Sequence, residues 1–318
     1  MKIAIVTGAN GFIGSHLVNN LVDRGYYVIA VIKTMNHISP MLVKICDDIS
    51  IVECDLNRIT TLKTILIEMG IMIDAPESLL FYHLAWDGVV GEGRYDCFLQ
   101  LENAKYSCDA VKVAWEIGST KFIGAGSIME DDCDISSDPI APASNPGYLQ
   151  YCAAKYTAHT MGKALAAQLG IDFCWAKISN AYGKLDMPER FIRSILTKML
   201  INQECELSES IHYYDFIYID DLVNAICDIG EKGYSGHSYY IGSGQPRILK
   251  DYVLAMHDIT KSKSVLKFGI VNAQNKSMDP TYFSIEKLQK HTGFECLISF
   301  EEGIKKTLDW LKTDLTLN

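Results

Sequence analysis

The first 180 residues alternate short apolar runs with amphipathic stretches. Each run is apolar throughout, which is typical of strands in a parallel sheet that helices cover on both faces. Between the runs, apolar residues return at helical spacing, as at Leu17 and Leu21 and along the alanine-rich stretch 151–169. We expect strands at 2–6, 27–32, 49–53, 79–84, 121–124 and 171–178. This alternation predicts an α/β fold with a Rossmann-like, doubly wound parallel sheet.

After residue 180 the pattern becomes irregular. We expect helices near 190–201, 249–260 and 300–312, and a strand-like FIYI at 216–219. A chain of 318 residues has room for one elaborated domain or two interlocked ones. We predict a dinucleotide-binding domain over 1–180, to which 212–242 return, and a smaller mixed α/β substrate lobe formed by 181–211 and 243–318.

Composition and charge narrow the function classes. Hydrophobic residues make up 48% and charged residues 21% of the chain, which excludes a disordered protein. The net charge of −10 argues against nucleic acid or an anionic membrane as partner, although an anionic small molecule stays possible. No signal-peptide pattern precedes the first strand, and no apolar run approaches the ~18 residues of a membrane span. The ten cysteines show no metal-ligand spacing, so we expect reduced thiols, no metal and a cytoplasmic location.

A glycine-rich loop connects the first strand to the first helix. In TGANGFIGSHL, three glycines allow the backbone to turn tightly and to approach a pyrophosphate at the helix N-terminus. The position between a strand and a helix is the context that a dinucleotide-binding motif requires. The predicted cofactor-binding residues of this loop are Gly8, Asn10, Gly11, Phe12, Ile13 and Gly14.

The end of the second strand bears on which dinucleotide binds. An NAD site usually places an acidic residue there, whereas this strand ends in Lys33 and no acid follows until Asp47. A cation suits the 2′-phosphate, so NADP(H) is favoured and NAD(H) remains possible; Lys33 could also be a solvated strand end. Asp55 and Leu56, after the third strand, are placed to face the adenine, although a helix N-cap is an equal alternative for Asp55.

A tyrosine and a lysine are four residues apart on the expected helix over 151–169. The ammonium of Lys155 would stabilise the phenolate of Tyr151, which could then exchange a proton near neutral pH. Such pairs are common on ordinary helix surfaces. The glycine loop, together with Ser127 after the fifth strand, makes a catalytic pair the favoured interpretation.

These motifs resemble the extended short-chain dehydrogenase/reductases, within them most closely the nucleotide-sugar epimerase/dehydratase/reductase branch. The similarity also includes His83-Leu84-Ala85, Asn180-Ala181-Tyr182-Gly183 and the run DFIYIDD at 215–221, and it spans most of residues 1–245. It implies an NAD(P)-dependent oxidoreductase that binds a nucleoside-diphosphate sugar in the C-terminal lobe. By matching positions, Tyr151 is the acid/base, Lys155 holds the nicotinamide ribose and tunes Tyr151, and Ser127 binds the reacting oxygen.

The resemblance extends to further binding residues and to assembly. For His83 itself, a hydrogen-bonded strand-end histidine is favoured over a proton relay. The helices at 97–117 and 151–169 are where this family usually forms a homodimer through a four-helix bundle. The family arginine that commonly grips the diphosphate is replaced by Tyr214, so Arg190, Arg193, Lys184 or Arg247 could substitute. The implied cofactor-lining residues are Leu84, Ala85 and Ile178, and the implied substrate-binding residues are Trp86, Ser127, Ile128, Tyr151, Asn180 and Arg190.

Differences between this sequence and the family motifs indicate which of the family's reactions the protein catalyses. Family dehydratases follow the serine position with Asp-Glu, whereas Ile128 and Met129 stand here and can transfer no proton. Met129 also replaces the cysteine of reductases that epimerise. What remains is redox chemistry at C4, and Lys33 favours NADPH-dependent reduction of a nucleoside-diphosphate 4-keto-6-deoxyhexose. An NAD-dependent 4-epimerase is the alternative function. A non-catalytic NADP sensor is a third possibility, but such sensors usually lack the Tyr or the Lys, and both are present here.

Overall fold

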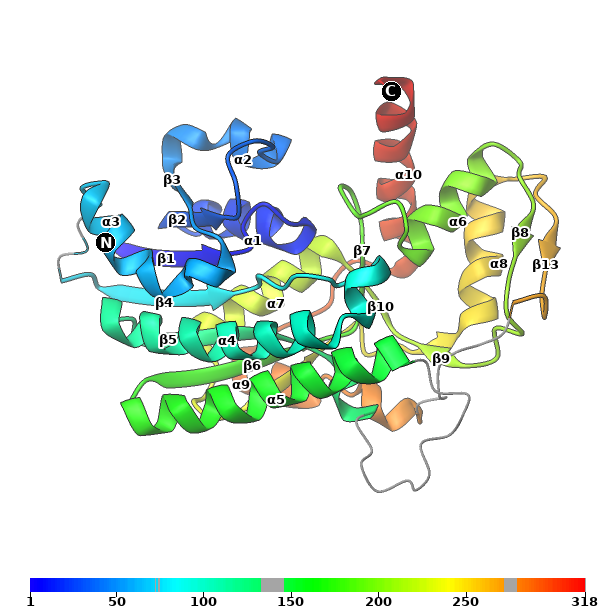
Figure 1. The fold of residues 1–318 in the computed structure, drawn as a ribbon. Helices are drawn as coiled ribbons and strands as arrows, with labels where there is room; N and C mark the ends of the chain where they lie inside the picture. The colour runs from blue at the N-terminus through cyan, green and yellow to red at the C-terminus, as the bar shows by residue number, and fades with distance from the viewer. Residues whose placement is uncertain (72, 74, 133–145, 272–278, 318) are drawn as a thin grey trace. The chain divides into compact units, whose positions relative to one another are not determined.

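The computed structural model describes residues 1–71, 73, 75–132, 146–271 and 279–317 (Figure 1). Their contacts divide the chain into two compact units. The first unit contains Met1–Ile178, Val223–Tyr239 and Lys290–Phe294, so two later segments return to the N-terminal part. The second contains Ser179–Leu222, Tyr240–Gln289 and Glu295–Asn318.

The first unit is built on a seven-stranded sheet in the order β11-β6-β5-β4-β1-β2-β3. From β6 to β3 every neighbouring pair is parallel, as in a doubly wound nucleotide-binding fold. The Rossmann-like fold class predicted from the sequence is therefore confirmed. The strands are β1 (Lys2–Thr7), β2 (Tyr26–Ile32), β3 (Ile49–Glu53), β4 (Ser78–His83), β5 (Lys121–Ser127), β6 (Asp172–Ile178) and β11 (Ser238–Ile241).

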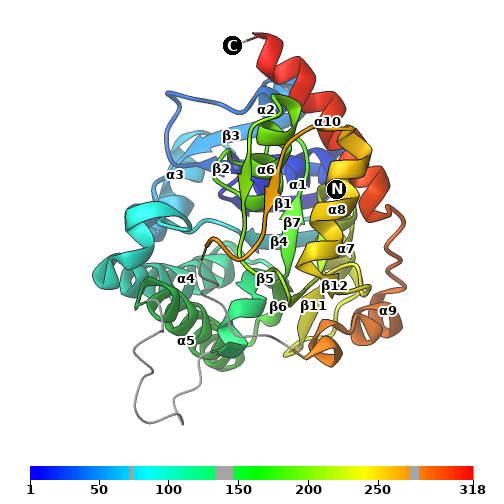
Figure 2. The ribbon, with the colours of Figure 1, turned by 90° about the vertical axis from the view of Figure 1, so that its right-hand side faces the viewer.

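Helices cover both faces of this sheet. In Figure 2, α4 (Cys97–Ile117) and α5 (Pro146–Leu169) lie side by side on one face, while α1 (Phe12–Asp23) and α7 (Ile219–Lys232) lie on the other. The shorter α2 (Pro40–Lys44) and α3 (Leu62–Glu68) follow β2 and β3. Buried Ala110 on α4 and Ala158 on α5 carry small side chains, which allow these helices to approach the strands and each other.

Stacked aromatic rings join the central strands on the side of α4 and α5. Phe81 on β4, Phe122 on β5 and Phe173 on β6 stack with centroid separations of 5.7 Å, and Trp175 continues the row at 5.8 Å. Beside this indole, β5 has Gly126, where a Cβ would overlap the ring. The packing of β6 thus dictates small residues near the carboxyl end of β5.

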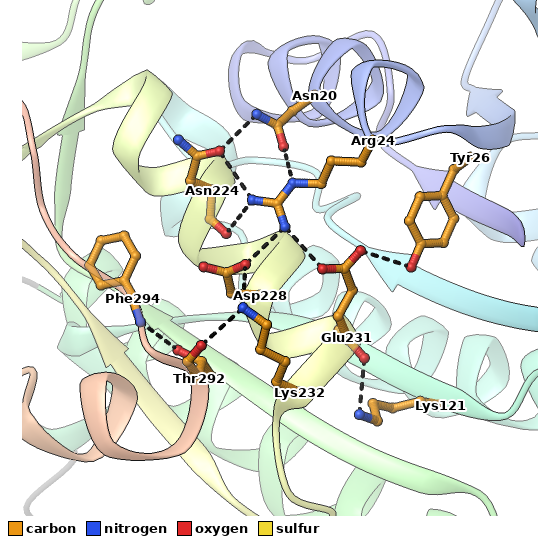
Figure 3. A network of polar contacts seen from close by, with 11 residues as sticks. Asn20, Arg24, Tyr26, Lys121, Asn224, Asp228, Glu231, Lys232, Thr292 and Phe294 are labelled. Atoms are coloured by element: carbon orange, nitrogen blue, oxygen red, sulfur yellow. Dashed lines mark hydrogen bonds and ion pairs between the residues drawn. The ribbon is translucent and has the colours of Figure 1, made fainter.

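Arg24, at the C-terminal end of α1, fixes α7 to the first unit (Figure 3). Its guanidinium forms ion pairs with Asp228 at 2.8 Å and Glu231 at 3.1 Å, and it donates to the side chain of Asn224. Glu231 also accepts from the hydroxyl of Tyr26. These partners lie about 200 residues away in the sequence, so the network holds the returning segment in place.

The second unit consists of short strand pairs and three longer helices. β7 (Asn180–Tyr182) pairs in parallel with β10 (Phe216–Tyr218), β8 (Cys205–Glu206) with β13 (Leu266–Lys267), and β9 (Tyr213–Tyr214) is antiparallel to β12 (Arg247–Ile248). The helices are α6 (Phe191–Leu200), α8 (Leu249–Thr260) and α10 (Phe300–Leu317); the short α9 spans Glu286–Thr292. Within the described ranges, no helix is long and apolar enough to cross a membrane.

Candidate functional site

The glycine loop forms a backbone cradle at the N-terminus of α1. Gly8 has φ +70°, and its carbonyl accepts from the amide of Gly11 at 3.0 Å. A Cβ at Gly14 would overlap the Gly8 carbonyl, and a Cβ at Gly8 would come within 2.7 Å of the Ala85 backbone. Close backbone approach and exposed helix N–H groups are what a pyrophosphate needs, so these residues fit a dinucleotide.

The other predicted residues of the loop support it in different ways. Asn10 bridges to the chain after β2: its amide donates to the carbonyl of His37 at 2.6 Å, and its oxygen accepts from the amide of Ser39 at 2.6 Å. Phe12 is buried, with its ring edge-on to that of His16, and Ile13 is half-buried. Asn10 stays a predicted cofactor-binding residue, and in the structure its side chain also connects the glycine loop to the segment after β2.

The carboxyl ends of β2, β3 and β4 bring three charged residues together. The ammonium of Lys33 lies 3.1 Å from Asp87 and 3.6 Å from Asp55. Its hydrogen bond to Asp87 raises the pKa of Lys33, so it remains a cation. Asp55 also accepts from the amide of Asn57 as N-cap of the 3₁₀ helix that begins at the buried Leu56. Lys33 is thus a solvent-exposed cation, with a side chain 60% exposed, that pairs with two carboxylates.

Tyr151 and Lys155 lie on α5, where Lys155 contacts β5 and the segment that follows β4. The Lys155 ammonium donates to the carbonyl of Ala125 at 2.9 Å and sits 3.6 Å from the ring centroid of Trp86. Trp86 in turn points its ring edge at Tyr151, with centroids 6.0 Å apart. Burial lowers the pKa of Lys155 to about 7, against the opposing charge of Glu130. The predicted pair and Trp86 therefore form one cluster.

Ser127 is the last residue of β5, where it pairs in register with Ile178 of β6. We expected a loop serine, but the ladder with β6 continues three residues beyond the predicted strand end. Its hydroxyl accepts from the amide of Met129 at 3.2 Å. Ser127, Ile128 and Ile178 are all at least nine-tenths buried, which keeps the end of β5 rigid.

A buried carboxylate below this cluster was missed by the sequence analysis. Glu130 is 1% exposed and accepts from the indole of Trp175 at 2.9 Å, and it lies 3.1 Å from the His159 ring and 3.3 Å from the Lys177 ammonium. His159 follows Lys155 by one helical turn. No spacing in the sequence connects Glu130 to these partners, because they come from β6 and α5.

Arg94 is a second residue that the sequence analysis missed. Its guanidinium carbon lies 4.5 Å from the ring centroid of Tyr151. The loop that carries it, GEGRYD, has no motif or periodicity that would single it out.

The remaining predicted residues lie in the second unit and have partners there. The amide of Asn180 donates to the carbonyl of Asp215 at 3.4 Å. Arg190 donates to the Ala181 carbonyl at 3.1 Å and lies 3.4 Å from Asp186, whose pKa burial raises to about 6. The other two candidate arginines also pair with carboxylates: Arg193 with Asp314 and Arg247 with Glu301.

Comparison with known proteins identifies the class. The model of the NAD dependent epimerase/dehydratase family matches residues 4–242, and the chain belongs to this family. It is therefore a nucleotide-sugar oxidoreductase of the short-chain dehydrogenase/reductase type, in a family described as NAD dependent. The class that the motifs predicted is confirmed, and the preference for NADP(H) stays a prediction.

Particular relatives cover the whole chain. It is 23% identical over 314 residues to CDP-abequose synthase of Salmonella muenchen, covering 96% of this chain and 97% of the relative. It is 26% identical to a trifunctional UDP-glucose 4,6-dehydratase/UDP-4-keto-6-deoxy-D-glucose 3,5-epimerase/UDP-4-keto-L-rhamnose-reductase of Arabidopsis thaliana, covering 97% of this chain and 47% of the relative. The crystal structure of Thermotoga maritima UDP-glucose 4-epimerase with UDP-glucose superposes with a TM-score of 0.79 at 22% identity, covering 99% of this chain and 100% of that one.

Proposed function

We propose that this enzyme reduces the C4 keto group of a nucleoside-diphosphate 4-keto-6-deoxyhexose with NADPH. The observation that carries the proposal is the cluster of Tyr151 and Lys155 with Trp86. Ser127 ends the neighbouring β5, and the next two residues, Ile128 and Met129, offer no acid or base for dehydration. The name of the trifunctional plant relative includes a 4-keto-sugar reductase beside a dehydratase and an epimerase, so such a reduction is among the activities of relatives.

The glycine loop suits the coenzyme pyrophosphate. Gly8, Gly11 and Gly14 would hold it at the N-terminus of α1. Leu84 and Ala85, packed against Gly8, and Ile178 at the end of β6 would line the nicotinamide side, while Asp55 and Leu56 would face the adenine. When bound, the coenzyme supplies the hydride.

The protein's part in the reaction is to hold the sugar carbonyl and deliver a proton. Ser127 would donate a hydrogen bond to the C4 oxygen, which polarises the carbonyl. As hydride reaches C4, Tyr151 gives its phenolic proton to the C4 oxygen, and the ketone becomes an alcohol. Lys155 stabilises the resulting phenolate by its charge and would hold the coenzyme ribose.

The substrate diphosphate is assigned to residues of the second unit. Asn180 supplies an amide at the start of β7, and Arg190 supplies a cation. Arg190 shares its charge with Asp186, so the diphosphate would compete with that carboxylate for the guanidinium. On the side of the sugar, Trp86 and Ile128 present apolar surface next to Tyr151.

Lys33 supports NADP(H) as the coenzyme. A 2′-phosphate would displace Asp87 from the Lys33 ammonium and gain a charge-assisted hydrogen bond. A second candidate function rests on the same three charged residues. Because Asp55 and Asp87 both lie beside Lys33, carboxylate acceptors for the ribose hydroxyls of NAD are also present. That arrangement favours an NAD-dependent 4-epimerase.

Two measurements decide between these functions. The purified enzyme is incubated with NADPH or NADH and UDP-, dTDP-, CDP- or GDP-4-keto-6-deoxyglucose, and coenzyme absorbance and product configuration are followed. We expect NADPH oxidation and a C4 alcohol. Interconversion of UDP-glucose and UDP-galactose without net coenzyme turnover would establish the epimerase instead.

A matched pair of variants tests the role of Tyr151. We expect Tyr151→Phe to lower kcat by about 10²–10⁴-fold with coenzyme affinity unchanged, because only the proton donor is lost. Tyr156→Phe, an exposed tyrosine on the same helix, is the control and should retain full activity. Unchanged behaviour of Tyr151→Phe in a protein that binds NADP(H) without turnover would indicate a coenzyme sensor.

We also propose that the enzyme is a homodimer through α4 and α5. These neighbouring helices expose large apolar side chains, among them Phe98 at 80%, Leu101 at 54% and Met161 at 58% exposure. Light scattering after size exclusion should give twice the chain mass, and the double variant Phe98→Asp/Met161→Lys should give one chain mass. A monomeric wild-type protein would contradict the proposal.

A further inference from the structure

Arg94 brings a cation against the catalytic tyrosine. It lies in a short 3₁₀ helix, Gly91–Tyr95, in the connection between β4 and α4. The guanidinium carbon is 4.5 Å from the ring centroid of Tyr151 and 5.9 Å from that of Tyr148. One of its nitrogens donates to the thioether of Met129 at 3.0 Å. Arg94 therefore touches the residue after Ile128 as well as the proton donor.

Among the residues that the structure describes, the guanidinium of Arg94 has no carboxylate partner. Arg24, Arg193 and Arg247 each form an ion pair with a carboxylate. In the described part of the chain, no carboxylate lies within 4 Å of the Arg94 guanidinium, and a thioether is a weak acceptor. Its Nε is enclosed and has no acceptor among the described residues.

The loop that carries Arg94 is firmly held. The buried Gln100 on α4 donates to the carbonyls of Gly88 at 3.1 Å and Gly93 at 2.9 Å. Gly147 on α5 lies so close to the ring of Tyr95 that a Cβ there would overlap it. These contacts on both sides keep the guanidinium on the face of Tyr151. The rings of Tyr148 and Tyr151 offset part of the cost of burying this charge, but its enclosed Nε has no acceptor among the described residues, and oxygen atoms of a ligand would supply acceptors for the guanidinium.

We propose that Arg94 is a substrate-binding residue that donates hydrogen bonds to oxygens of the hexose beside the carbon served by Tyr151. The assignment rests on the proposed function, which places the reacting sugar carbon at the Tyr151 hydroxyl. A planar guanidinium offers several donors in a fixed geometry, which suits neighbouring sugar oxygens. Because the guanidinium stacks on the tyrosine that protonates the sugar, its ligand is the hexose and not the diphosphate.

Calorimetric titration with matched ligands tests this assignment. The wild-type enzyme loaded with the oxidised coenzyme, which cannot reduce the ketone, is titrated with UDP-, dTDP-, CDP- and GDP-4-keto-6-deoxyglucose. The nucleotide that binds best is then used both as this sugar conjugate and as the free nucleoside diphosphate. We expect Arg94→Met to weaken binding of the sugar conjugate about ten- to hundredfold, as for loss of a charged hydrogen bond. Affinities for the free nucleoside diphosphate and for the coenzyme should stay within about twofold. Arg58→Met, an exposed arginine of the same unit, is the control and should match the wild type.

Each other outcome overturns a distinct claim. If the wild type and Arg94→Met bind the sugar conjugate equally well, the role of Arg94 is wrong and the proposed function is unaffected. An equal loss for the conjugate and the free diphosphate also overturns it, because Arg94 would then act on the diphosphate. A wild-type enzyme that binds none of the four conjugates overturns both this inference and the proposed function. If Arg94→Met does not fold, Arg94→Lys keeps the charge without the planar donors and should still weaken sugar binding selectively.

Discussion

His83, the last residue of β4, shows how a single ionisable side chain takes its role from its surroundings. Its ring nitrogens lie 2.8 Å from the Thr7 hydroxyl and 3.3 Å from the Ser107 hydroxyl. Burial, with a smaller contribution from the Lys155 charge, lowers the pKa of His83 to about 3. The ring is therefore neutral at physiological pH and connects β1, β4 and α4, as favoured from the sequence over a proton relay.

This environment predicts a specific dependence of stability on pH. Between pH 6.5 and 3 the unfolded chain binds a proton at His83 that the folded protein does not, so stability falls as pH falls through this window. His83→Gln keeps hydrogen-bonding atoms but does not titrate. We expect the wild type to lose about 2–3 kcal/mol more than this variant between pH 7 and 4.5. Urea unfolding at several pH values measures the difference.

The exposed His37 provides the control for this prediction. His37→Gln should have the same pH profile of stability as the wild type, since that side chain is exposed to solvent. Parallel profiles for His83→Gln and the wild type would show that His83 titrates alike in both states, against the prediction.

At the scale of elements, two glycines inside helices differ in whether a side chain would fit: there is no space for a Cβ at Gly14, whereas there is space at Gly162. Gly14, in the first turn of α1, faces the Gly8 carbonyl, and a Cβ there would overlap backbone that cannot move away. Gly162, in the middle of α5, faces the ring of Phe173 at an ordinary contact distance of 3.4 Å. The first is required by the coenzyme loop, whereas the second only adds backbone freedom to the unfolded chain.

Alanine substitutions at the two positions should therefore change the free energy of unfolding in opposite directions. We expect Gly14→Ala to destabilise the protein by about 1–3 kcal/mol and to abolish coenzyme binding, because the loop must open to admit the methyl group. Gly162→Ala should stabilise it by about 0.5–1 kcal/mol. Thermal unfolding and coenzyme titration measure both effects, and destabilisation by Gly162→Ala would contradict the contact geometry.

At the scale of the whole molecule, the first unit depends on chain segments that return to it late. Arg24 connects α1 to α7, and the ammonium of Lys232 on α7 donates to the carbonyl of Thr292 at 3.1 Å (Figure 3). The side chains of Arg24 and Asp228 are only 24% and 15% exposed, so solvent screens their ion pair less than a surface pair.

Loss of this connection should weaken the whole first unit. We expect Arg24→Met to lower the free energy of unfolding by about 1–3 kcal/mol, between the values for surface and buried pairs. Adding Asp228→Asn should cost less in this variant than in the wild type, because the pair is already broken. Lys105→Met, which removes an exposed pair with Asp109 on α4, is the control and should cost under about 0.5 kcal/mol. Equal losses for Arg24→Met and Lys105→Met would contradict the role of the network.

The sequence predicted most of this unit because its signals are local. Apolar runs placed all six parallel strands, and glycine spacing placed the coenzyme loop between β1 and α1. The errors lie at the ends of elements: β5 continues to Ser127 because it pairs with β6, and α5 begins at Pro146, five residues before the predicted start. The sequence analysis expects 212–242 to return to this unit, whereas the contacts of the structure place 223–239 and also 290–294 in it. No short window of the sequence indicates the second segment.

The family, the nucleotide-binding fold and the Tyr151–Lys155 pair follow from the sequence itself. The Tyr151–Lys155 spacing lies within one helix, and the fold and the family follow from short local motifs in their order along the chain. Only the tertiary structure decided the surroundings of these residues. It paired Lys33 with Asp55 and Asp87 and set Arg94 against Tyr151, because loops that follow different strands of a parallel sheet meet at one edge. Residues far apart in the chain thereby become neighbours, and the contacts between their side chains decide which charged groups are paired.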